Sequence, residues 1–298
     1  MLRLHAPAKL NLFLHVVGKR PDGYHELETL FERIDLADEL TFAPAARLQL
    51  TCSDPSLDTG PSNLVTKAAV LLQEATGIST GATIHLTKRI PIAAGLGGGS
   101  SDAATALLGL NRLWAAGLSR QTLRELGAQV GSDVPFFLEE AAFGIGRGRG
   151  ERCEALAEPW PSLWHVLVSL DARLSTQEVY EGLDGTALTP PRGAGLTPPR
   201  PSLNILVHAL RNGSLRELAE GMSNDLQPEA IRRCPVIEKI QQHLRATGCL
   251  GTMVSGSGPS VFGFCEDRAQ AQRVAQQLRR NADPSWRIAV VKTFKNDQ

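Results

Sequence analysis

Two side chains of this sequence are best suited to activate a hydroxyl group, a carboxylate and an ammonium. Asp133 stands in the segment Gly131–Pro135, just before an apolar run, where it could accept a proton from a hydroxyl. Lys9 lies on the polar side of an alternating segment, where it could keep a carboxylate ionised or neutralise charge that develops on a phosphate. Taken alone, Asp133 is also typical of a turn or helix cap and Lys9 of a solvated strand face, so both alternatives stay open.

A glycine-dense segment could hold a phosphate. It consists of Pro91, Ile92, Ala93, Ala94, Gly95, Leu96, Gly97, Gly98, Gly99, Ser100 and Ser101. Glycines let backbone amides turn toward one point, and a helix that begins near Ser101 would add its unpaired N–H groups to the same place. The two serines could also donate a hydrogen bond or hold Mg²⁺. The segment has neither the lysine of a P-loop nor the spacing of a dinucleotide fingerprint, and a flexible surface loop is the alternative.

Two further glycine-rich stretches carry weaker signals. Residues 251–260 could wrap backbone amides around a substrate phosphate or could form a hairpin turn, and composition does not separate the two. Residues 144–150 alternate glycine with arginine, which favours a turn between strands. The histidines His5, His85, His165, His208 and His243 show no metal-ligand spacing, so we expect no metal site built from protein ligands.

The composition restricts the class of partner. Lysine plus arginine and aspartate plus glutamate both number 31, so no basic field attracts nucleic acid, and we expect a small-molecule partner. No stretch approaches the ~20 apolar residues of a membrane helix, and the amino terminus resembles neither a signal nor a transit peptide. The five cysteines are scattered without a CxxC pair, which favours a reducing compartment and structural thiols. These features predict a cytoplasmic protein without a membrane or nucleic-acid partner.

Hydrophobic periodicity indicates the elements that position the candidate residues. Leu10–Val16 alternates, with Leu10, Leu12, Leu14 and Val16 on one face and Lys9, Asn11, Phe13 and His15 on the other. Turn residues 18–23 follow, and residues 24–34 predict a returning strand. Residues 63–75 predict an amphipathic helix with Ser62 or Asn63 as its cap, and residues 82–114 read as strand, glycine loop and helix.

The second half of the chain predicts a mixture of helices and strands. Helices are expected over residues 202–210, 215–222 and 234–246, and strands over 252–264 and 286–292. A sequence of five residues, Leu188–Arg192, recurs at Leu196–Arg200 within a proline- and glycine-rich loop that we expect to be mobile. With 298 residues, the chain has the length of two domains or one large domain, and a boundary is expected near residues 152–161.

Three features in this order resemble the GHMP kinase superfamily, which includes galactokinase, homoserine kinase and mevalonate kinase. They are the strand Pro7–Leu12, the loop Pro91–Ser101 and the late segment Gly256–Ser260. The resemblance implies an α+β, two-domain GHMP kinase fold. It implies an N-terminal ATP-binding domain over residues 1–153 that is like ribosomal protein S5 domain 2. A ferredoxin-like α/β domain would cover residues 154–298, with the active site in the cleft between the two.

Within this superfamily, three segments resemble the branch that phosphorylates the 2-hydroxyl of a cytidine diphosphate-linked polyol in the non-mevalonate route to isoprenoid precursors. They are Arg20–His25, Gly95–Ala104 and Gly131–Pro135, and the match spans nearly the whole chain. The resemblance implies ATP and Mg²⁺ as cofactors. It also implies an enzyme that acts as a monomer or a weak homodimer.

The resemblance carries the functional residues of the branch onto this sequence. Its catalytic pair falls on Lys9 and Asp133, and its ATP loop on residues 91–101, which agrees with the candidates found from the residues alone. Asn63 is expected near the adenine. Cytosine would be held by Tyr24 and Tyr180 through stacking and read by His25, and the polar groups nearby would be Asn11 and Thr176.

The sequence departs from the pattern of the branch at three places. Ala93 stands where relatives often have glycine, Gln227 stands where glutamate is common, and residues 188–201 form an insertion. None of them touches the catalytic pair. Two alternatives stay open: another GHMP kinase that acts on homoserine or a mevalonate-type alcohol, and a silent nucleotide-binding module on the same scaffold.

Overall fold

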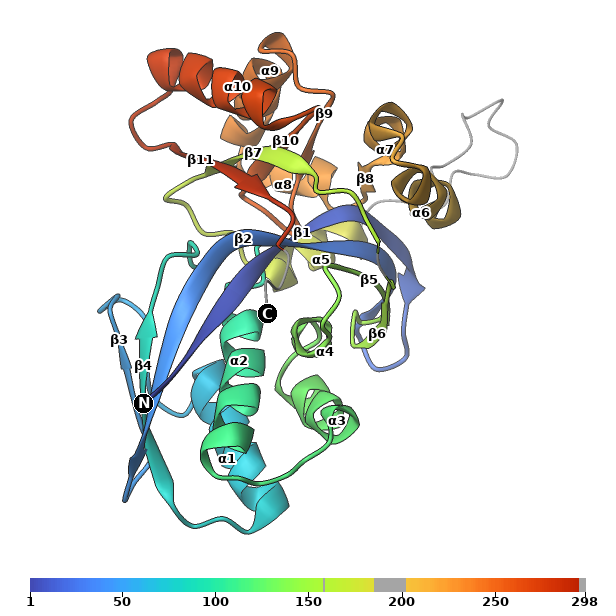
Figure 1. Ribbon diagram of the computed structural model, residues 1–298. Helices are drawn as coiled ribbons and strands as arrows, with labels where there is room; N and C mark the ends of the chain where they lie inside the picture. Colours follow the sequence, from blue (N-terminus) through green and yellow to red (C-terminus); the bar gives the residue numbers. More distant parts are fainter. Residues whose placement is uncertain (158, 185–201, 295–298) are drawn as a thin grey trace.

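The computed structural model describes residues 1–157, 159–184 and 202–294, and it consists of two β-sheets with helices packed on their faces (Figure 1). The larger sheet has seven strands in the order β3-β4-β2-β1-β8, with β5 paired to β2 and β6 paired to β5. Its strands are β1 Leu2–Lys19, β2 His25–Ala45, β3 Gln49–Cys52, β4 Gly81–Thr87, β5 Phe143–Gly148, β6 Arg152–Ala155 and β8 Ser223–Asn224.

The first two strands form the predicted hairpin. They pair antiparallel around a turn that is closed by a 2.7 Å hydrogen bond from the backbone N–H of Arg20 to the carbonyl of Tyr24. Both strands are longer than the segments that alternate in the sequence. The long hairpin matters for the site because Lys9 lies near the middle of β1.

The expected faces of β1 are wrong at Phe13. The register between β1 and β2 shifts between Asn11 and Phe13, so one extra residue stands in the pairing and the following side chains change face. Phe13 is therefore fully buried with Leu10 and Leu12, whereas Leu14 packs in a separate cluster that includes Leu226. A bulge of this kind depends on the partner strand, and the alternation within one strand does not reveal it.

The smaller sheet has four antiparallel strands in the order β11-β7-β10-β9. Its strands are β7 Trp164–Ser169, β9 Gly251–Val254, β10 Val261–Cys265 and β11 Arg287–Lys292. With α9 (Val236–Ala246) between β7 and β9 and α10 (Arg268–Asn281) between β10 and β11, the chain order and the strand order are those of a ferredoxin-like domain. The single strand expected over residues 252–264 is wrong, because Gly256 and Gly258 adopt positive φ and turn the chain between β9 and β10.

Ten helices are found in the described parts of the chain. They are α1 Leu64–Thr76, α2 Gly98–Leu113, α3 Arg120–Val130, α4 Val134–Leu138, α5 Thr176–Asp184, α6 Leu203–Asn212, α7 Leu215–Gly221, α8 Gln227–Arg233, α9 Val236–Ala246 and α10 Arg268–Asn281. The expected helices correspond to α1, α2, α6, α7 and α9. Helix α2 begins at Gly98, earlier than the expected start near Ser101, and Asn63 caps α1 as predicted.

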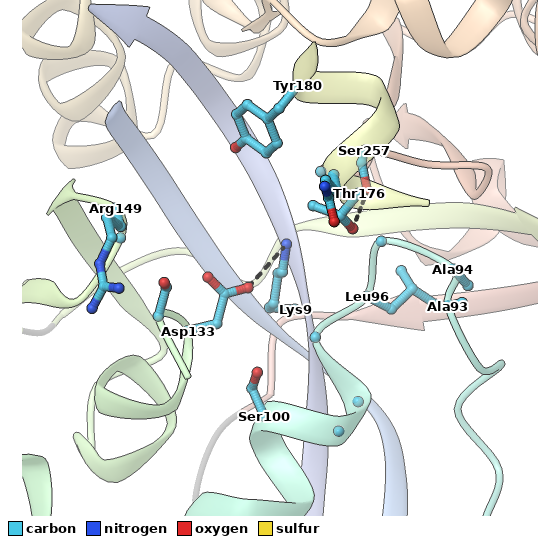
Figure 2. Close-up of a pocket in the computed structure, with 18 of the residues that line it drawn as sticks. Lys9, Ala93, Ala94, Leu96, Ser100, Asp133, Arg149, Thr176, Tyr180 and Ser257 are labelled. Carbon is cyan, nitrogen blue, oxygen red and sulfur yellow. Dashed lines mark hydrogen bonds and ion pairs between the residues drawn. The ribbon is translucent and has the colours of Figure 1, made fainter. Parts of the chain in front are cut away.

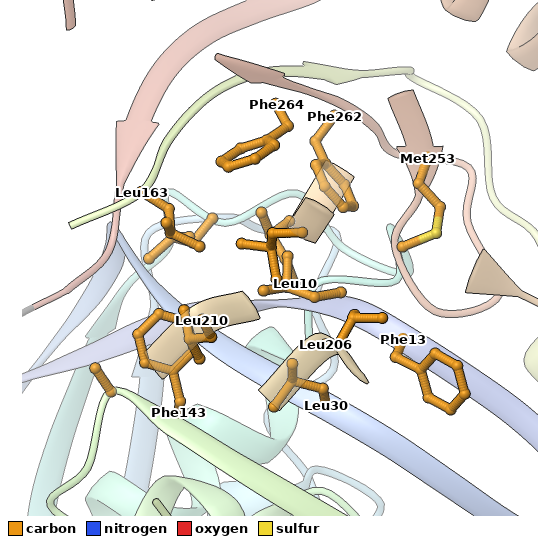
Figure 3. Packing of buried hydrophobic residues seen from close by; sticks show 14 of the residues in the cluster. Leu10, Phe13, Leu30, Phe143, Leu163, Leu206, Leu210, Met253, Phe262 and Phe264 are labelled. Atoms are coloured by element: carbon orange, nitrogen blue, oxygen red, sulfur yellow. The ribbon is translucent and has the colours of Figure 1, made fainter. Parts of the chain in front are cut away.

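Three layers of apolar side chains hold the sheets and helices together. One face of the larger sheet packs against α1 to α4, and the outer face of the smaller sheet packs against α9 and α10 (Figure 1). Between the two sheets lies a third cluster, in which Leu10 and Leu30 of the larger sheet meet Phe262 and Phe264 of the smaller sheet and Leu206 of α6 (Figure 3). This central cluster fixes the position of one sheet relative to the other.

Several expectations about organisation can be compared with these elements. The boundary expected between residues 153 and 154 falls inside β6, and the chain passes from the larger to the smaller sheet between Ala155 and Trp164. The division into 1–153 and 154–298 stays a prediction. The repeated proline-rich segment lies outside the described residues. No helix in the described ranges is long and apolar enough to cross a membrane.

Candidate active site

A cavity of about 1000 Å³ brings the predicted residues together (Figure 2). It is lined by β1, β2, the glycine segment, the start of α2, the residue before α4, helix α5 and the turn between β9 and β10. The predicted residues that line it are Lys9, Asn11, Tyr24, His25, Asn63, Pro91, Ile92, Ala93, Ala94, Gly95, Leu96, Gly97, Gly98, Gly99, Ser100, Asp133, Thr176 and Tyr180.

Ser101 is the one predicted residue that the structure does not bring to the cavity. Its side chain is fully buried, and its hydroxyl has no hydrogen-bond partner. The early start of α2 explains this, because Ser101 lies in the second half of the first turn and faces the sheet. Ser100 instead points toward the space beside Asp133 (Figure 2).

Lys9 and Asp133 form an ion pair at the floor of the cavity. The Lys9 Nζ atom lies 3.6 Å from an Asp133 carboxylate oxygen, and the Lys9 side chain is only 5% exposed. Asp133 occupies the cap position of α4, but its side chain makes no capping hydrogen bond, so the carboxylate faces Lys9 and the cavity instead. Burial lowers the pKa of Lys9, and the charge of Asp133 opposes this shift in part. Lys9 is therefore not on a solvated strand face. Asp133 stands at the cap position of α4, but its side chain does not act as a cap.

A chain of hydrogen bonds on β1 and β2 holds Lys9 in place. The Lys9 ammonium donates to the side-chain oxygen of Asn11 at 2.5 Å, and the Asn11 amide nitrogen donates to the Thr29 hydroxyl at 2.8 Å. The Thr29 hydroxyl donates in turn to the carbonyl of Phe13 at 2.5 Å. All three polar side chains are buried, so their orientations are restricted by these bonds.

The glycine segment is anchored to both sheets by its backbone. The backbone N–H of Lys9 donates to the carbonyl of Leu96 at 3.0 Å, and the Ser255 hydroxyl donates to the carbonyl of Gly95 at 2.9 Å. A Cβ atom on Gly95 would lie 2.0 Å from the carbonyl oxygen of Ser255, so only glycine fits this contact. The segment is thus a fixed wall of the cavity and not a flexible surface loop.

The turn between β9 and β10 serves as a hairpin turn and also lines the cavity. Gly256 and Ser257 face the space above Lys9, and a Cβ atom on Gly256 would lie 3.2 Å from the Lys9 Nζ atom. The Ser257 hydroxyl lies 2.9 Å from the hydroxyl of Thr176, which joins the turn to the start of α5 (Figure 2). The hairpin turn is therefore confirmed, and a role of its backbone amides toward a substrate phosphate stays a prediction.

An aromatic group forms the end of the cavity near the β1–β2 turn. The rings of His25 and Tyr180 stack with centroids 5.2 Å apart, and burial raises the pKa of the Tyr180 hydroxyl. Tyr24 is 54% exposed, and the guanidinium of Arg149 lies over its ring at 4.7 Å. Tyr180 therefore stacks on His25, and Tyr24 stacks on Arg149, so the two tyrosines do not form a stacked pair in the described structure. A flat ligand would have to bind beside these rings.

At the opposite end of the cavity, Asn63 lines the wall and also makes hydrogen bonds that stabilise the local fold. Its side-chain oxygen accepts a 2.9 Å hydrogen bond from the backbone N–H of Val65, and its amide nitrogen donates to the carbonyl of Asp58 at 2.6 Å. These contacts fix the loop before α1 against the start of that helix. Asn63 thus shapes this end of the cavity, and Leu57 and Leu64 provide apolar surface around it.

A buried charge cluster lies below the glycine segment. The Lys88 ammonium is 2.5 Å from Asp38 and 2.7 Å from Asp102, and all three side chains are almost fully buried. Burial raises the pKa of Asp102 to about 7, and the neighbouring Asp38 carboxylate adds to this effect while Lys88 opposes it. Two carboxylates share one ammonium here, and one oxygen of Asp102 has no hydrogen-bond partner.

Four residues of the site were not found from the sequence. Thr29 lies on β2, Lys88 follows β4 and Asp102 lies on α2, and their spacing did not single them out as site residues. Arg149 lies in the stretch that was expected to be a turn. That expectation was correct only for residues 149 and 150, since residues 143–148 form β5. The alternating arginines were the available signal for Arg149. In the described parts of the chain, no group of three or more histidine, cysteine, aspartate or glutamate side chains could hold a metal ion.

Comparison with known proteins places these features in a family. The family models for the GHMP kinases N terminal domain and the GHMP kinases C terminal match residues 63–140 and 206–283. A protein of Pelotomaculum thermopropionicum called 4-diphosphocytidyl-2-C-methyl-D-erythritol kinase is 43% identical, with 97% of this chain and 96% of that protein covered. One of the same name from Citrifermentans bemidjiense is 40% identical, with 98% and 99% covered.

Solved structures give the same result. A crystal structure of 4-(cytidine 5'-diphospho)-2C-methyl-D-erythritol kinase is similar to this chain with a TM-score of 0.78 and 36% identity, and it covers 98% of this chain and 100% of its own. A mevalonate kinase reaches a TM-score of 0.73 at 14% identity, with 99% of this chain and 100% of its own covered. At that identity the second match shows a shared fold only.

Proposed function

The chain belongs to the 4-diphosphocytidyl-2-C-methyl-D-erythritol kinases, a family of the GHMP kinases, and we propose that Lys9 and Asp133 carry out its reaction. The enzyme transfers a phosphoryl group from ATP to the 2-hydroxyl of 4-diphosphocytidyl-2-C-methyl-D-erythritol, a step of the non-mevalonate route to isoprenoid precursors. The observation that carries the residue assignment is the ion pair of 3.6 Å between Lys9 and Asp133 at the floor of the cavity.

In the proposed mechanism, Asp133 accepts the proton of the substrate hydroxyl as the oxygen attacks the terminal phosphorus of ATP. The bond between this phosphorus and its bridging oxygen breaks, and ADP leaves with that oxygen. Asp133 can do so because its carboxylate is free of capping bonds and faces the cavity. Lys9 supplies a positive charge beside the carboxylate and beside the phosphoryl oxygens. Such a transfer depends mainly on positioning and on electrostatic stabilisation, and the bonds from Asn11 to Lys9 and Thr29 provide the positioning.

We propose that the phosphates of ATP lie against residues 91–101 and the start of α2. The first N–H groups of a helix have no partner within the helix, and α2 begins at Gly98 on the cavity wall. A wall of glycines without Cβ atoms allows close approach of the phosphates. The adenine would then lie toward Asn63, Leu57 and Leu64 at the end of the cavity.

Mg²⁺ is a further proposal. The ion usually binds through substrate phosphates, water and one or two carboxylates and not in an all-protein cage. Ser100 and Asp133 are among the oxygen-bearing side chains that line the cavity near the start of α2, so they would be candidate protein ligands of such an ion. Its chemical contribution when bound would be to neutralise charge on the phosphates.

The cytidine end of the substrate would lie at the aromatic end of the cavity. Tyr24 and Tyr180 would contact the base through their ring faces, with His25 as a polar partner and Thr176 nearby. Arg149 lines the cavity between Tyr24 and Asp133, so its charge is placed for the diphosphate that links the base to the polyol. A cytoplasmic location and a monomer or weak homodimer stay predictions from the sequence.

One experiment tests the proposed function and its alternatives. The protein is incubated with ATP and with 4-diphosphocytidyl-2-C-methyl-D-erythritol, homoserine or mevalonate, and the products are followed by phosphorus NMR. We expect phosphorylation of the cytidine compound alone. Phosphorylation of another alcohol would preserve the fold and the chemistry but contradict the substrate. The absence of ATP consumption with all three compounds would favour a silent nucleotide-binding module.

A further inference from the structure

Lys9 stands directly opposite a second buried cation in the β1–β2 ladder. The register pairs Lys9 of β1 with Arg33 of β2, and both side chains are 4% exposed. Residues opposite each other in an antiparallel pair point to the same face of the sheet, and like charges in such a pair are unfavourable. Lys9 lines the cavity and Arg33 is buried behind it, so a reason is needed for placing two buried positive charges opposite each other in the ladder.

Both cations reach the same short helix, from opposite ends. Lys9 lies beside Asp133, the residue immediately before α4. Arg33 donates through one nitrogen to two backbone carbonyls at the other end of α4, those of Phe136 and Glu139, the latter at 2.6 Å. At about 1.5 Å per residue, the five residues of α4 span only about 7 Å, so a shift of one end moves the other.

In the described structure, the side chain of Arg33 donates hydrogen bonds only to these two carbonyls, and its Nε atom has no hydrogen-bond partner. Its guanidinium lies 5.0 Å from the ring centre of Phe136, and the side chain of Glu139 pairs with Arg124 instead, at 2.8 Å. Burial lowers the pKa of Arg33 to about 10, which leaves it charged at neutral pH. Burying an arginine against carbonyls without a carboxylate in contact is costly, and a role in fixing these two carbonyls accounts for it.

We propose that Arg33 is a positioning residue for Asp133, which it acts on through helix α4. The paired residues Lys9 and Arg33, which form one rung of the β1–β2 ladder, contact the two ends of the helix. They thereby set the separation of the Lys9 ammonium and the Asp133 carboxylate. This inference rests on the proposed role of Asp133 as the base. A displacement of about 1 Å at a reacting group can cost about 100-fold in rate, so a small movement of α4 is sufficient for a large effect.

The test replaces Arg33 with methionine, which keeps an unbranched apolar side chain and removes the donors. We expect kcat of Arg33→Met to fall by about 10- to 100-fold, with KM for ATP and for the cytidine substrate within about threefold of wild type. Arg33→Lys keeps the charge on a shorter side chain, whose ammonium cannot reach both carbonyls with the same geometry, and we expect it to restore part of kcat. A kcat of Arg33→Met within about twofold of wild type, measured on folded protein, would overturn the proposal.

A matched control separates positioning from stability. Arg120 also donates to a carbonyl at this end of α4, that of Leu138 at 2.7 Å, but from α3 and from a partly exposed site. We expect Arg120→Met to keep kcat within about twofold, and a loss equal to that of Arg33→Met would contradict the special role of the rung. If Arg33→Met does not fold, Arg33→Lys decides, because an unchanged kcat in that variant would overturn the proposal.

A double variant shows whether Arg33 acts through Asp133. If it does, Arg33→Met combined with Asp133→Asn is no slower than Asp133→Asn alone, since the group being positioned is already removed. Losses that multiply would overturn the proposal and leave the assignment of Asp133 intact. Wild-type turnover in Asp133→Asn would overturn the assignment of the base, and the proposal with it.

Discussion

Thr29 lines the cavity, and it can be tested without changing Lys9, Asn11 or Asp133. Its hydroxyl has one proton, which is donated to the carbonyl of Phe13, so its oxygen is free to accept from the amide nitrogen of Asn11. This leaves the side-chain oxygen of Asn11 as the group that faces Lys9. The orientation of Asn11, and with it the position of the Lys9 ammonium, therefore depends on a hydroxyl that is 1% exposed.

Thr29→Val keeps the shape of the side chain and removes this hydroxyl. Two buried groups, the amide of Asn11 and the carbonyl of Phe13, then each lose a hydrogen bond, and an unsatisfied buried group costs about 1–3 kcal/mol. We expect a loss of stability of at least about 2 kcal/mol. With an unfolding entropy of about 2.1 cal/mol/K per residue over 298 residues, this corresponds to a fall in Tm of about 3 °C.

The same change is expected to reduce turnover. If the Asn11 amide rotates to find a new partner, its nitrogen faces the Lys9 ammonium, and two donors repel each other. We expect kcat to fall by about 10-fold, since Lys9 is no longer held beside Asp133. Thermal unfolding followed by circular dichroism and a coupled assay of ATP consumption measure the two effects, with Thr29→Ser as the control that keeps the hydroxyl. A Thr29→Val variant with the Tm and kcat of wild type would refute this reasoning.

Three further variants test other parts of the account. Tyr180→Ala removes a ring face that contributes about 1–3 kcal/mol to the binding of a stacked base. Steady-state kinetics should show that KM for the cytidine substrate rises about 10-fold while KM for ATP stays the same. Equal changes in both KM values would contradict the placement of the base. Because the pKa of Asp102 is raised to about 7 in the folded protein, its contribution to stability is present below the unfolded pKa of about 4 and is lost as the pH rises through about 7. Asp102→Asn cannot titrate, so its Tm should fall less than that of wild type between about pH 5 and pH 8, and parallel curves would count against the shifted group. Ala93 adopts a φ of 54°, where glycine is favoured. Ala93→Gly should raise Tm by about 1 °C in calorimetry, because the relief of about 1–2 kcal/mol of backbone strain exceeds the stability lost to the greater entropy of the unfolded chain. A lower Tm would show that the strain is absent.

The sequence predicted local features whose cause is local. The turn after β1 and the cap at Asn63 depend on residues within a few positions, and both are found. The glycine segment could be predicted because its shape comes from missing side chains. Its fixed position could not, since that depends on a contact with Ser255, which lies 160 residues away in the sequence.

The features that the sequence did not reveal depend on pairing between distant strands. Phe13 changes face because of a bulge relative to β2, and the significance of Arg33 follows from its place opposite Lys9. The strand expected over residues 252–264 failed because apolar residues on both sides of a glycine turn resemble one continuous strand. A buried cation such as Arg33 is also unexpected from its charge alone, because its partners are backbone carbonyls that have no signature in the sequence.

The most direct test of the central claim is the turnover of Asp133→Asn together with its affinity for ATP. We expect the rate of phosphorylation of the cytidine substrate to fall by about 10²- to 10⁴-fold, with a Kd for ATP within about threefold of wild type. The control Glu181→Gln removes a carboxylate that lines the same cavity away from Lys9 and should keep its rate. Turnover of Asp133→Asn close to that of wild type would contradict the assignment of Asp133 as the base.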